Sequence, residues 1–279
     1  MRELEFYKMQ AAGNDYVYVD ARGLDLGDIS KLAIGISDRH FGVGSDGLVL
    51  ILDSQVADYK MRMFNADGSE AQMCGNASRC VGKFIYENGL STSQVISIET
   101  LAGIKILSLS IVNGIVESVS VDMGAPILDS MSIPVIAEDS SKVAIEVDGT
   151  EYLFTCISMG NPHAVTYVQN VDNFDVEGVG RVIENHPLFP ERTNVEFIQV
   201  ITPTKIKMRV WERGSGETLA CGTGACASVV AGVINSVGAN EVTVKLLGGE
   251  VVVKWSGVKE SVILTGDAQW VFRGKYLIY

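Results

Sequence analysis

The stretch MRMFNADGSEAQMCGN (residues 61–76) recurs later in the chain as MRVWERGSGETLACGT (residues 208–223). Both copies begin with Met-Arg and reach a Cys-Gly pair after the same number of residues, so Cys74 and Cys221 are separated by 147 positions. Self-similarity at a fixed offset is the signature of an internal duplication. The sequence therefore predicts two like domains, each with one cysteine at the same place.

Two further segments repeat at the same offset. Gly13-Asn14 maps onto Gly160-Asn161, and residues 48–51 map onto residues 195–198. Runs of β-branched residues with alternating polarity dominate both halves and predict strands, whereas a helical pattern follows each cysteine. We therefore expect an α+β fold of two pseudo-symmetric domains, each a β-rich sheet wrapped around a central helix. The active site is expected in the cleft between them.

The repeat also indicates the domain boundaries. Residues 1–126 with 269–279 form the first predicted domain, and residues 127–268 form the second, of which 127–148 are expected to link the halves. The last stretch lies beyond the second repeat, so we expect it to pair back onto the first domain. The predicted helices are the two that follow the cysteines and two further candidates: Ala77–Glu87, Gly224–Ser236, Gly23–Gly35 and Val176–Asn185.

Composition narrows the class of protein. A chain of 279 residues with 47% hydrophobic and 20% charged residues is globular and long enough for two domains. The net charge of −12 argues against a nucleic-acid partner, and no apolar run is long enough to span a membrane. No signal or transit peptide is visible, and the odd set of five cysteines fits a reducing cytoplasm. We expect a cytoplasmic protein that binds a small molecule.

Cys74 and Cys221 each lie where a polar turn gives way to a predicted helix. Amide groups at a helix start lack intrahelical partners and carry partial positive charge, so they can bind a carboxylate and stabilise a thiolate. Burial as a small hydrophobic residue is the expected state of Cys80, Cys156 and Cys226. A zinc site fails because the spacing places neighbouring cysteines on different sides of a helix, whereas a redox pair of Cys74 and Cys221 stays open.

The positions at which the halves differ are also informative. The second half carries polar or titratable residues at four equivalent places, where Tyr16, Gly47, Asn65 and Ala66 become His163, Asn194, Glu212 and Arg213. A Glu-Arg pair can hold an ammonium and a carboxylate through charge-assisted hydrogen bonds. We therefore expect a ligand with two polar ends, although a structural histidine and a solvated surface pair remain alternatives.

Four motifs together resemble the signatures of the diaminopimelate epimerase family: Gly-Asn-Asp-Tyr (13–16), Ala-Asp-Gly-Ser-Glu-x-x-x-Cys-Gly-Asn (66–76), Gly-Asn-Pro-His (160–163) and Glu-Arg-Gly-x-Gly-Glu-Thr-x-Ala-Cys-Gly-Thr-Gly (212–224). The resemblance covers nearly the whole chain in the family's order and spacing. It implies an enzyme that interconverts LL- and meso-diaminopimelate without cofactor or metal, by acid–base chemistry at two thiols. It also implies a homodimer, for which the aromatic residues near the C-terminus are candidate contacts.

The resemblance assigns roles residue by residue. Cys74 and Cys221 match the two acid–base thiols, and His163 and Glu212 match the polar pair that tunes them. The substrate-binding positions are Asn14, Gly47, Asn65, Gly75, Asn76, Asn161, Asn194, Glu212, Arg213, Gly222 and Thr223. Among these, the glycine-containing pairs Gly75-Asn76 and Gly222-Thr223 match the backbone donors to the carboxylate at the reacting centre.

The chain departs from the usual family pattern at three places, and two other functions compete. Gln10 stands where histidine is usual, Gly47 where several members have glutamine, and Ala77 where glycine is common. Gly47 removes a possible side-chain contact to the substrate. A proline or hydroxyproline racemase of the same fold is the alternative enzyme, although Arg213 would have no second charged end to hold. A binding module without enzymatic activity would not need paired cysteines.

Overall fold

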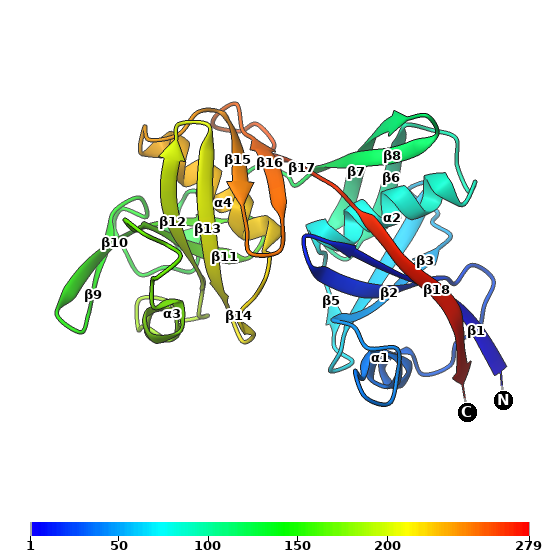
Figure 1. Ribbon diagram of the computed structural model, residues 1–279. Helices are drawn as coiled ribbons and strands as arrows, with labels where there is room; N and C mark the ends of the chain where they lie inside the picture. Colours follow the sequence, from blue (N-terminus) through cyan, green and yellow to red (C-terminus); the bar gives the residue numbers. More distant parts are fainter. Residues whose placement is uncertain (1, 279) are drawn as a thin grey trace. The chain divides into compact units, whose positions relative to one another are not determined.

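The computed structural model describes residues 2–278, and the chain divides into two compact units. Unit 1 comprises the chain up to Val121 and again from Thr265, and unit 2 comprises Asp122–Leu264. These boundaries lie a few residues before those proposed from the repeat, at 126/127 and 268/269. Unit 2 is therefore an insertion in the sequence of unit 1, as the colours of Figure 1 show.

Unit 1 is built on one sheet with the strand order β18-β1-β2-β3-β4-β6-β7-β8. The pairs β2–β3 and β4–β6 are parallel and the others antiparallel. Its elements are β1 (Arg2–Ala11), β2 (Asn14–Asp20), α1 (Ile29–Ser37), β3 (Gly47–Leu52), β4 (Tyr59–Asn65), β5 (Glu70–Ala71), α2 (Gly75–Glu87), β6 (Val95–Thr100), β7 (Gly103–Val112), β8 (Ile115–Asp122) and β18 (Gln269–Ile278).

Unit 2 repeats this arrangement with the order β9-β10-β11-β12-β13-β15-β16. Here β11–β12 and β13–β15 are the parallel pairs. Its elements are the 3₁₀ turn η1 (Ser130–Ser132), β9 (Val143–Val147), β10 (Thr150–Ser158), β11 (Pro162–Tyr167), α3 (Val176–Glu184), β12 (Asn194–Thr202), β13 (Lys205–Glu212), β14 (Gly216–Glu217), α4 (Gly222–Ile234), β15 (Glu241–Lys245) and β16 (Glu250–Lys254). The remaining strand, β17 (Ile263–Gly266), contains the second boundary between the units.

The two sheets share one register, which explains why the sequence repeat keeps a constant offset. In unit 1 Tyr16 pairs with Gly47, and in unit 2 His163 pairs with Asn194. Because side chains of a strand alternate between its two faces, an identical register brings equivalent residues to equivalent faces. The two halves therefore present their matching and their differing residues at the same positions of the same architecture.

The predicted linker at 127–148 was wrong in part, because β9 lies inside it and pairs with β10. Val143–Val147 alternates buried and exposed residues, and the turn that follows is Asp148-Gly149, with φ of 50° and 78°. Positive φ at both central residues is the geometry of a type I′ hairpin, which Asp-Gly favours. The repeat did not indicate this strand, because its place in the unit 1 sheet is taken by β18, which comes from the other end of the sequence.

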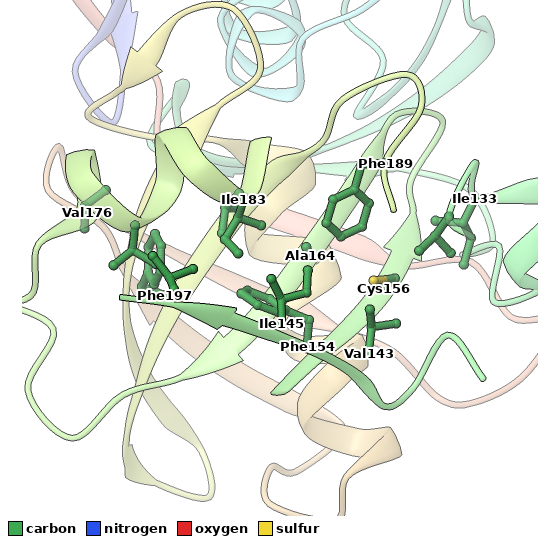
Figure 2. Packing of buried hydrophobic residues seen from close by; sticks show 14 of the residues in the cluster. Ile133, Val143, Ile145, Phe154, Cys156, Ala164, Val176, Ile183, Phe189 and Phe197 are labelled. Carbon is green, nitrogen blue, oxygen red and sulfur yellow. The ribbon is translucent and has the colours of Figure 1, made fainter. Parts of the chain in front are cut away.

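A cluster of aromatic and aliphatic side chains forms one core of unit 2 (Figure 2). Phe154 and Phe197 are fully buried within it, and Ile183 reaches it from α3. Helix α4 is buried from Gly224 to Gly232, as is typical of a helix that is small and apolar nearly all round. Small residues allow strands to approach such a helix closely, so the helix is enclosed by its sheet.

Most helices agree with the predictions. Helices α2 and α4 begin two residues earlier than predicted, at Gly75 and Gly222, and the α3 prediction is confirmed. The prediction for α1 was wrong in its first part, since the helix begins only after the N-cap Asp28. The pairing of the C-terminal stretch with the first unit is confirmed by the β1–β18 ladder. Within residues 2–278, none of the helices is long and apolar enough to cross a membrane.

The buried thiols predict how stability depends on pH. Burial raises the pKa of Cys80 and of Cys156 to about 12, from an ordinary 9.0. The unfolded chain loses these protons above about pH 9 while the folded chain keeps them, so stability falls as pH rises. We expect each thiol to lower the unfolding free energy by about 1.4 kcal/mol per pH unit in this range. Urea unfolding of wild type and Cys156→Ala measures this, and an equal slope in both proteins would contradict it.

Candidate active site

Cys74 and Cys221 occupy equivalent positions, because each is the N-cap of a 13-residue helix. Their backbones are extended, with φ/ψ of −138°/124° at Cys74 and −121°/111° at Cys221. A two-residue strand, β5 or β14, precedes each cysteine and pairs with the neighbouring long strand. The first-turn amides that follow, including those of Gly75 and Gly222, therefore lie at the positive end of a helix dipole.

Asn14 is a polar neighbour of Cys74. Its Oδ1 lies 3.4 Å from Cys74 Sγ and accepts from Asn76 Nδ2 at 3.4 Å. Its Nδ2 donates to Asp46 Oδ2 at 2.7 Å, which turns the amide oxygen toward the thiol. Cys74 is half-buried. Asn14 Oδ1 is therefore oriented to accept a hydrogen bond from the Cys74 thiol.

Two other positions assigned by resemblance lie at the ends of the strands that lead to Cys74. Gly47 and Asn65 are register partners in β3 and β4. Asn65 Nδ2 donates to Ser69 Oγ at 3.0 Å, inside the turn between β4 and β5. A Cβ atom added at Gly47 would overlap the carbonyl oxygen of Phe64. A glutamine at position 47 would therefore require the β3–β4 backbone to shift.

Cys221 lies in a more buried and more acidic setting. It is 6% exposed, accepts from Gly224 N at 3.4 Å, and lies 3.5 Å from Thr223 Oγ1. Burial raises the pKa of Cys221 well above its ordinary value, and the charges of Glu212 and Glu196 raise it further, while the bonds from Thr223 and Gly224 oppose the shift. The thiol form is therefore favoured in the unliganded protein.

Glu212, the last residue of β13, accepts a hydrogen bond from Thr218. Burial raises its pKa, whereas hydrogen bonds from Thr218 and Cys221 and the nearby His163 oppose that rise. A carboxyl group with a raised pKa beside a thiol is a common feature of acid–base sites. Glu212 is thus a neighbour of Cys221. The resemblance assigns Glu212, together with His163, to the pair that tunes the thiols.

Asn194 and Arg213 are brought together at the ends of β12 and β13. Asn194 is 4% exposed, accepts from Arg213 N at 2.9 Å, and donates to Pro162 O at 2.8 Å. The Arg213 guanidinium donates to Glu191 O at 3.0 Å through Nη1. Asn194 therefore fixes the backbone that presents Arg213, and the guanidinium keeps further donors for a ligand.

His163 is fully buried, and its two ring nitrogens contact Glu196 and Asn161. Its Nδ1 is 2.7 Å from Glu196 Oε1, and its Nε2 is 3.1 Å from Asn161 Oδ1. Asn161 Nδ2 in turn donates to Thr223 Oγ1 at 3.3 Å. The contacts of His163 thus reach the thiol through Asn161 and Thr223, and His163 also acts on Glu212 beside the thiol. Sequence reasoning missed Glu196, although a glutamate within the apolar run of β12 was a visible signal.

Glu196 also explains why residue 224 is glycine. A Cβ atom at Gly224 would lie 2.6 Å from Glu196 Oε1 and 3.3 Å from Cys221 Sγ. We expect Gly224→Ala to lower the free energy of unfolding by about 1–3 kcal/mol through overpacking. Gly232→Ala in the same helix is the matched control. The Cβ atom that it adds meets only Gly238 atoms, at 3.7 Å or more, and the substitution also removes a flexible glycine. Urea unfolding distinguishes them, and equal effects would contradict the close approach of Glu196.

Comparisons with known proteins agree over nearly the whole chain. A sequence model described as diaminopimelate epimerase matches residues 6–128 and 155–271. The diaminopimelate epimerase of Acetivibrio thermocellus is 54% identical over 98% of this chain and 98% of its own. That of Methanococcus maripaludis strain C5 is 53% identical over 98% of this chain and 99% of its own.

Solved structures extend the likeness of fold. A phenazine biosynthesis protein of the PhzF family from Bacillus anthracis has a TM-score of 0.71 at 20% identity, over 100% of both chains. A hydroxyproline epimerase from Agrobacterium vitis has a TM-score of 0.67 at 16% identity, over 99% of this chain and 91% of that one. At these identities the likeness establishes the fold alone.

Proposed function

Since the chain belongs to the diaminopimelate epimerase family, we propose that it interconverts LL- and meso-2,6-diaminopimelate by removing the α-proton with the thiolate of one cysteine, Cys74 or Cys221, and returning a proton from the thiol of the other. The observation that carries the proposal is the placement of both cysteines as N-caps of equivalent helices. The proposed reaction would make the protein a cofactor-independent isomerase of lysine and peptidoglycan precursor biosynthesis.

The chemistry requires one acid and one base. A thiolate takes the α-proton from one face, the C–H bond breaks, and its electron pair stays on the substrate as a carbanion. The thiol on the other face then gives its proton to that carbon, which inverts the centre and leaves a thiolate there. Both cysteines must therefore reach one α-carbon during the reaction. In the reverse direction the two groups exchange roles.

The first turns of α2 and α4 supply the electrostatic help. The α-proton of an amino acid is weakly acidic, so charge that develops toward the carboxylate must be stabilised. Gly75-Asn76 and Gly222-Thr223 are the proposed backbone donors to that carboxylate, because amides at helix N-termini favour negative charge. The substrate ammonium would also bring positive charge to Cys221, which opposes the effect of Glu212 and Glu196 on its pKa.

The remaining side chains are proposed to hold the substrate. Arg213 would bind the distal carboxylate, with Asn194 fixing its backbone at 2.9 Å. Asn14, Asn65, Asn161 and Glu212 would supply further hydrogen bonds. A proline or hydroxyproline racemase lacks support beyond the fold, since a compact imino acid offers Arg213 no second carboxylate.

We further propose a cytoplasmic homodimer. None of the five cysteines, all of which lie within the described residues, is in a disulfide, which suits a reducing compartment. The strand β18 exposes Val271 and Phe272, at 54% and 49%, and contiguous exposed apolar residues suit an interface. Sedimentation of the purified protein tests this state.

Proton exchange tests the proposed reaction directly. The enzyme is incubated in heavy water with LL-diaminopimelate, and in parallel with L-proline, while the α-proton signal is followed by NMR. We expect the signal of diaminopimelate to disappear as the meso isomer forms, and that of proline to persist. Exchange of proline alone would replace the proposal by the racemase alternative, and exchange of neither would contradict both.

A further inference from the structure

Glu196 is a charged residue at a place where the sheet is otherwise apolar. It is fully buried in β12, among residues that are buried on both faces of the strand. The equivalent position in unit 1 is Val49, and the equivalent of its partner His163 is Tyr16. Burial of a carboxylate is costly unless it is paired. At these two positions unit 2 therefore carries an ionisable pair where unit 1 carries Val49 and Tyr16.

The pair is the inner end of a continuous set of polar contacts that reaches Cys221. Glu196 Oε1 is 2.7 Å from His163 Nδ1, and His163 Nε2 is 3.1 Å from Asn161 Oδ1. Asn161 Nδ2 is 3.3 Å from Thr223 Oγ1, which lies 3.5 Å from Cys221 Sγ. All five residues belong to unit 2, so the set depends on that unit alone.

The two ring nitrogens of His163 both face oxygen atoms. An imidazole donates to two acceptors only when both nitrogens carry a proton, which makes the ring positively charged. A fully buried cation needs an opposite charge in contact, and Glu196 supplies it. Glu196 Oε2 has no hydrogen-bond partner among residues 2–278. The positive charge of the His163 ring therefore also compensates the negative charge of the Glu196 carboxylate. The pair then carries no net charge.

The protonated ring fixes the two side chains beyond it. With Nε2 as a donor, Asn161 presents its oxygen to His163 and its Nδ2 to Thr223, which is the arrangement in the structure. Thr223 Oγ1 thus accepts from Asn161 and keeps its own proton to donate to Cys221 Sγ. If His163 lost the Nε2 proton, the Asn161 amide would turn over, and Thr223 would donate to Asn161 instead.

We propose that Glu196 is a positioning residue that keeps His163 doubly protonated, so that Asn161 and Thr223 are oriented to donate a hydrogen bond toward Cys221. The inference rests on the proposed acid–base role of Cys221 and deepens it. A donor to the sulfur stabilises the thiolate that must form whenever Cys221 gives up its proton. Glu196 thereby acts on the reaction without touching the substrate.

Other ionisable groups near the site must be considered in any pH profile. Cys221 is influenced by Glu212 from β13 and by Glu196 from β12, and Glu212 is influenced by His163 from β11. Glu196 also raises the pKa of Cys156, which lies in β10. Of these groups, only the His163–Glu196 pair is joined to Cys221 through Asn161 and Thr223. A signal from the histidine ring itself is therefore the most direct readout.

The first experiment observes the ring in protein labelled with ¹⁵N-histidine. The chain has three histidines, and a spectrum of His163→Asn assigns the one of interest. An exposed histidine loses its second proton near about pH 6.5. At one neutral pH we expect both ring nitrogens of His163 to carry a proton in wild type and only one of them in Glu196→Gln. A singly protonated His163 in the wild type at neutral pH would overturn the proposal.

The second experiment measures the reactivity of Cys221 toward iodoacetamide against pH, by mass spectrometry of its peptide. In Glu196→Gln the orientation of Asn161 is no longer compulsory, so we expect the midpoint to move to a pH about one unit higher and kcat to fall about tenfold. The negative charge of Glu196 by itself raises the pKa of Cys221, so if that effect were larger than the loss of orientation, the midpoint in Glu196→Gln would move to lower pH. A lower or unchanged midpoint would overturn the proposed orientation.

A structural carboxylate provides the matched control. Glu87 in unit 1 accepts from Lys83 at 2.8 Å and from Val116 N at 2.8 Å, so Glu87→Gln removes a comparable charge outside the site. We expect it to lower stability without moving the His163 signals or the Cys221 midpoint. Both readouts are independent of substrate. They would therefore stand even if the proposed epimerase activity failed its own test.

Discussion

Replacing Cys74 or Cys221 by serine is expected to lower the rate of epimerisation by about three orders of magnitude or more, with both units still folded. A serine hydroxyl is far less acidic than a thiol, so it serves poorly as a base at neutral pH. Because each thiol acts as acid in one direction and base in the other, loss of either blocks both directions. The measurement is the approach to equilibrium from each isomer.

The matched control is Cys156→Ala, which removes a cysteine of the unit 2 core. It should lower stability and retain turnover. Elimination of halide from a β-halogenated analogue needs a base on one face only, so for each isomer of the analogue one of the two serine variants should retain it. Near-normal epimerisation by either serine variant would refute the two-thiol mechanism.

Arg213→Met is expected to raise KM for diaminopimelate by about tenfold to a hundredfold while kcat changes little. A hydrogen bond to a charged group is worth about 1.5–3 kcal/mol, and a group remote from the reacting carbon contributes mainly to binding. The Arg213 guanidinium has one contact within unit 2, to Glu191 O at 3.0 Å, so its other donors remain for a carboxylate.

Arg213→Lys serves as the comparison, because an ammonium keeps the charge but loses the planar fork. It should give a KM between those of wild type and Arg213→Met. Thermal unfolding of both variants checks that the turn after β13 is preserved. A KM unchanged in both would show that the distal carboxylate binds elsewhere and would reopen the racemase alternative.

The duplication made much of the fold predictable from sequence. Two helices that follow the cysteines, the long strands around them and the return of the C-terminal stretch could all be inferred, because both repeats carry the same pattern at one offset. What has no counterpart could not be inferred in this way. The strand Val143–Val147 lies in a segment found only between the repeats, although its alternation and the Asp148-Gly149 turn were visible signals.

The same contrast between residues with and without an informative counterpart applies to the candidate active site. Cys74 and Cys221 are identifiable because they match each other, and His163 and Arg213 because they differ from their equivalents. Glu196 was not predicted as a site residue, because its importance depends on a partner from another strand. His163 and Glu196 are 33 positions apart and meet only through the parallel register of β11 and β12. The local sequence does not specify the register between two parallel strands.

The ladder between β1 and β18 has a mechanical consequence. Arg2 pairs with Ile278, so the first and last described residues lie side by side on neighbouring antiparallel strands (Figure 1). A force applied between the ends would open this ladder like a zipper, one pair after another, instead of shearing all pairs at once. A short peptide joining the ends would close the same strands into a ring. The chain could then be cut open at a surface turn such as Asn113-Gly114, which gives a circular permutant whose first and last residues lie at a hairpin.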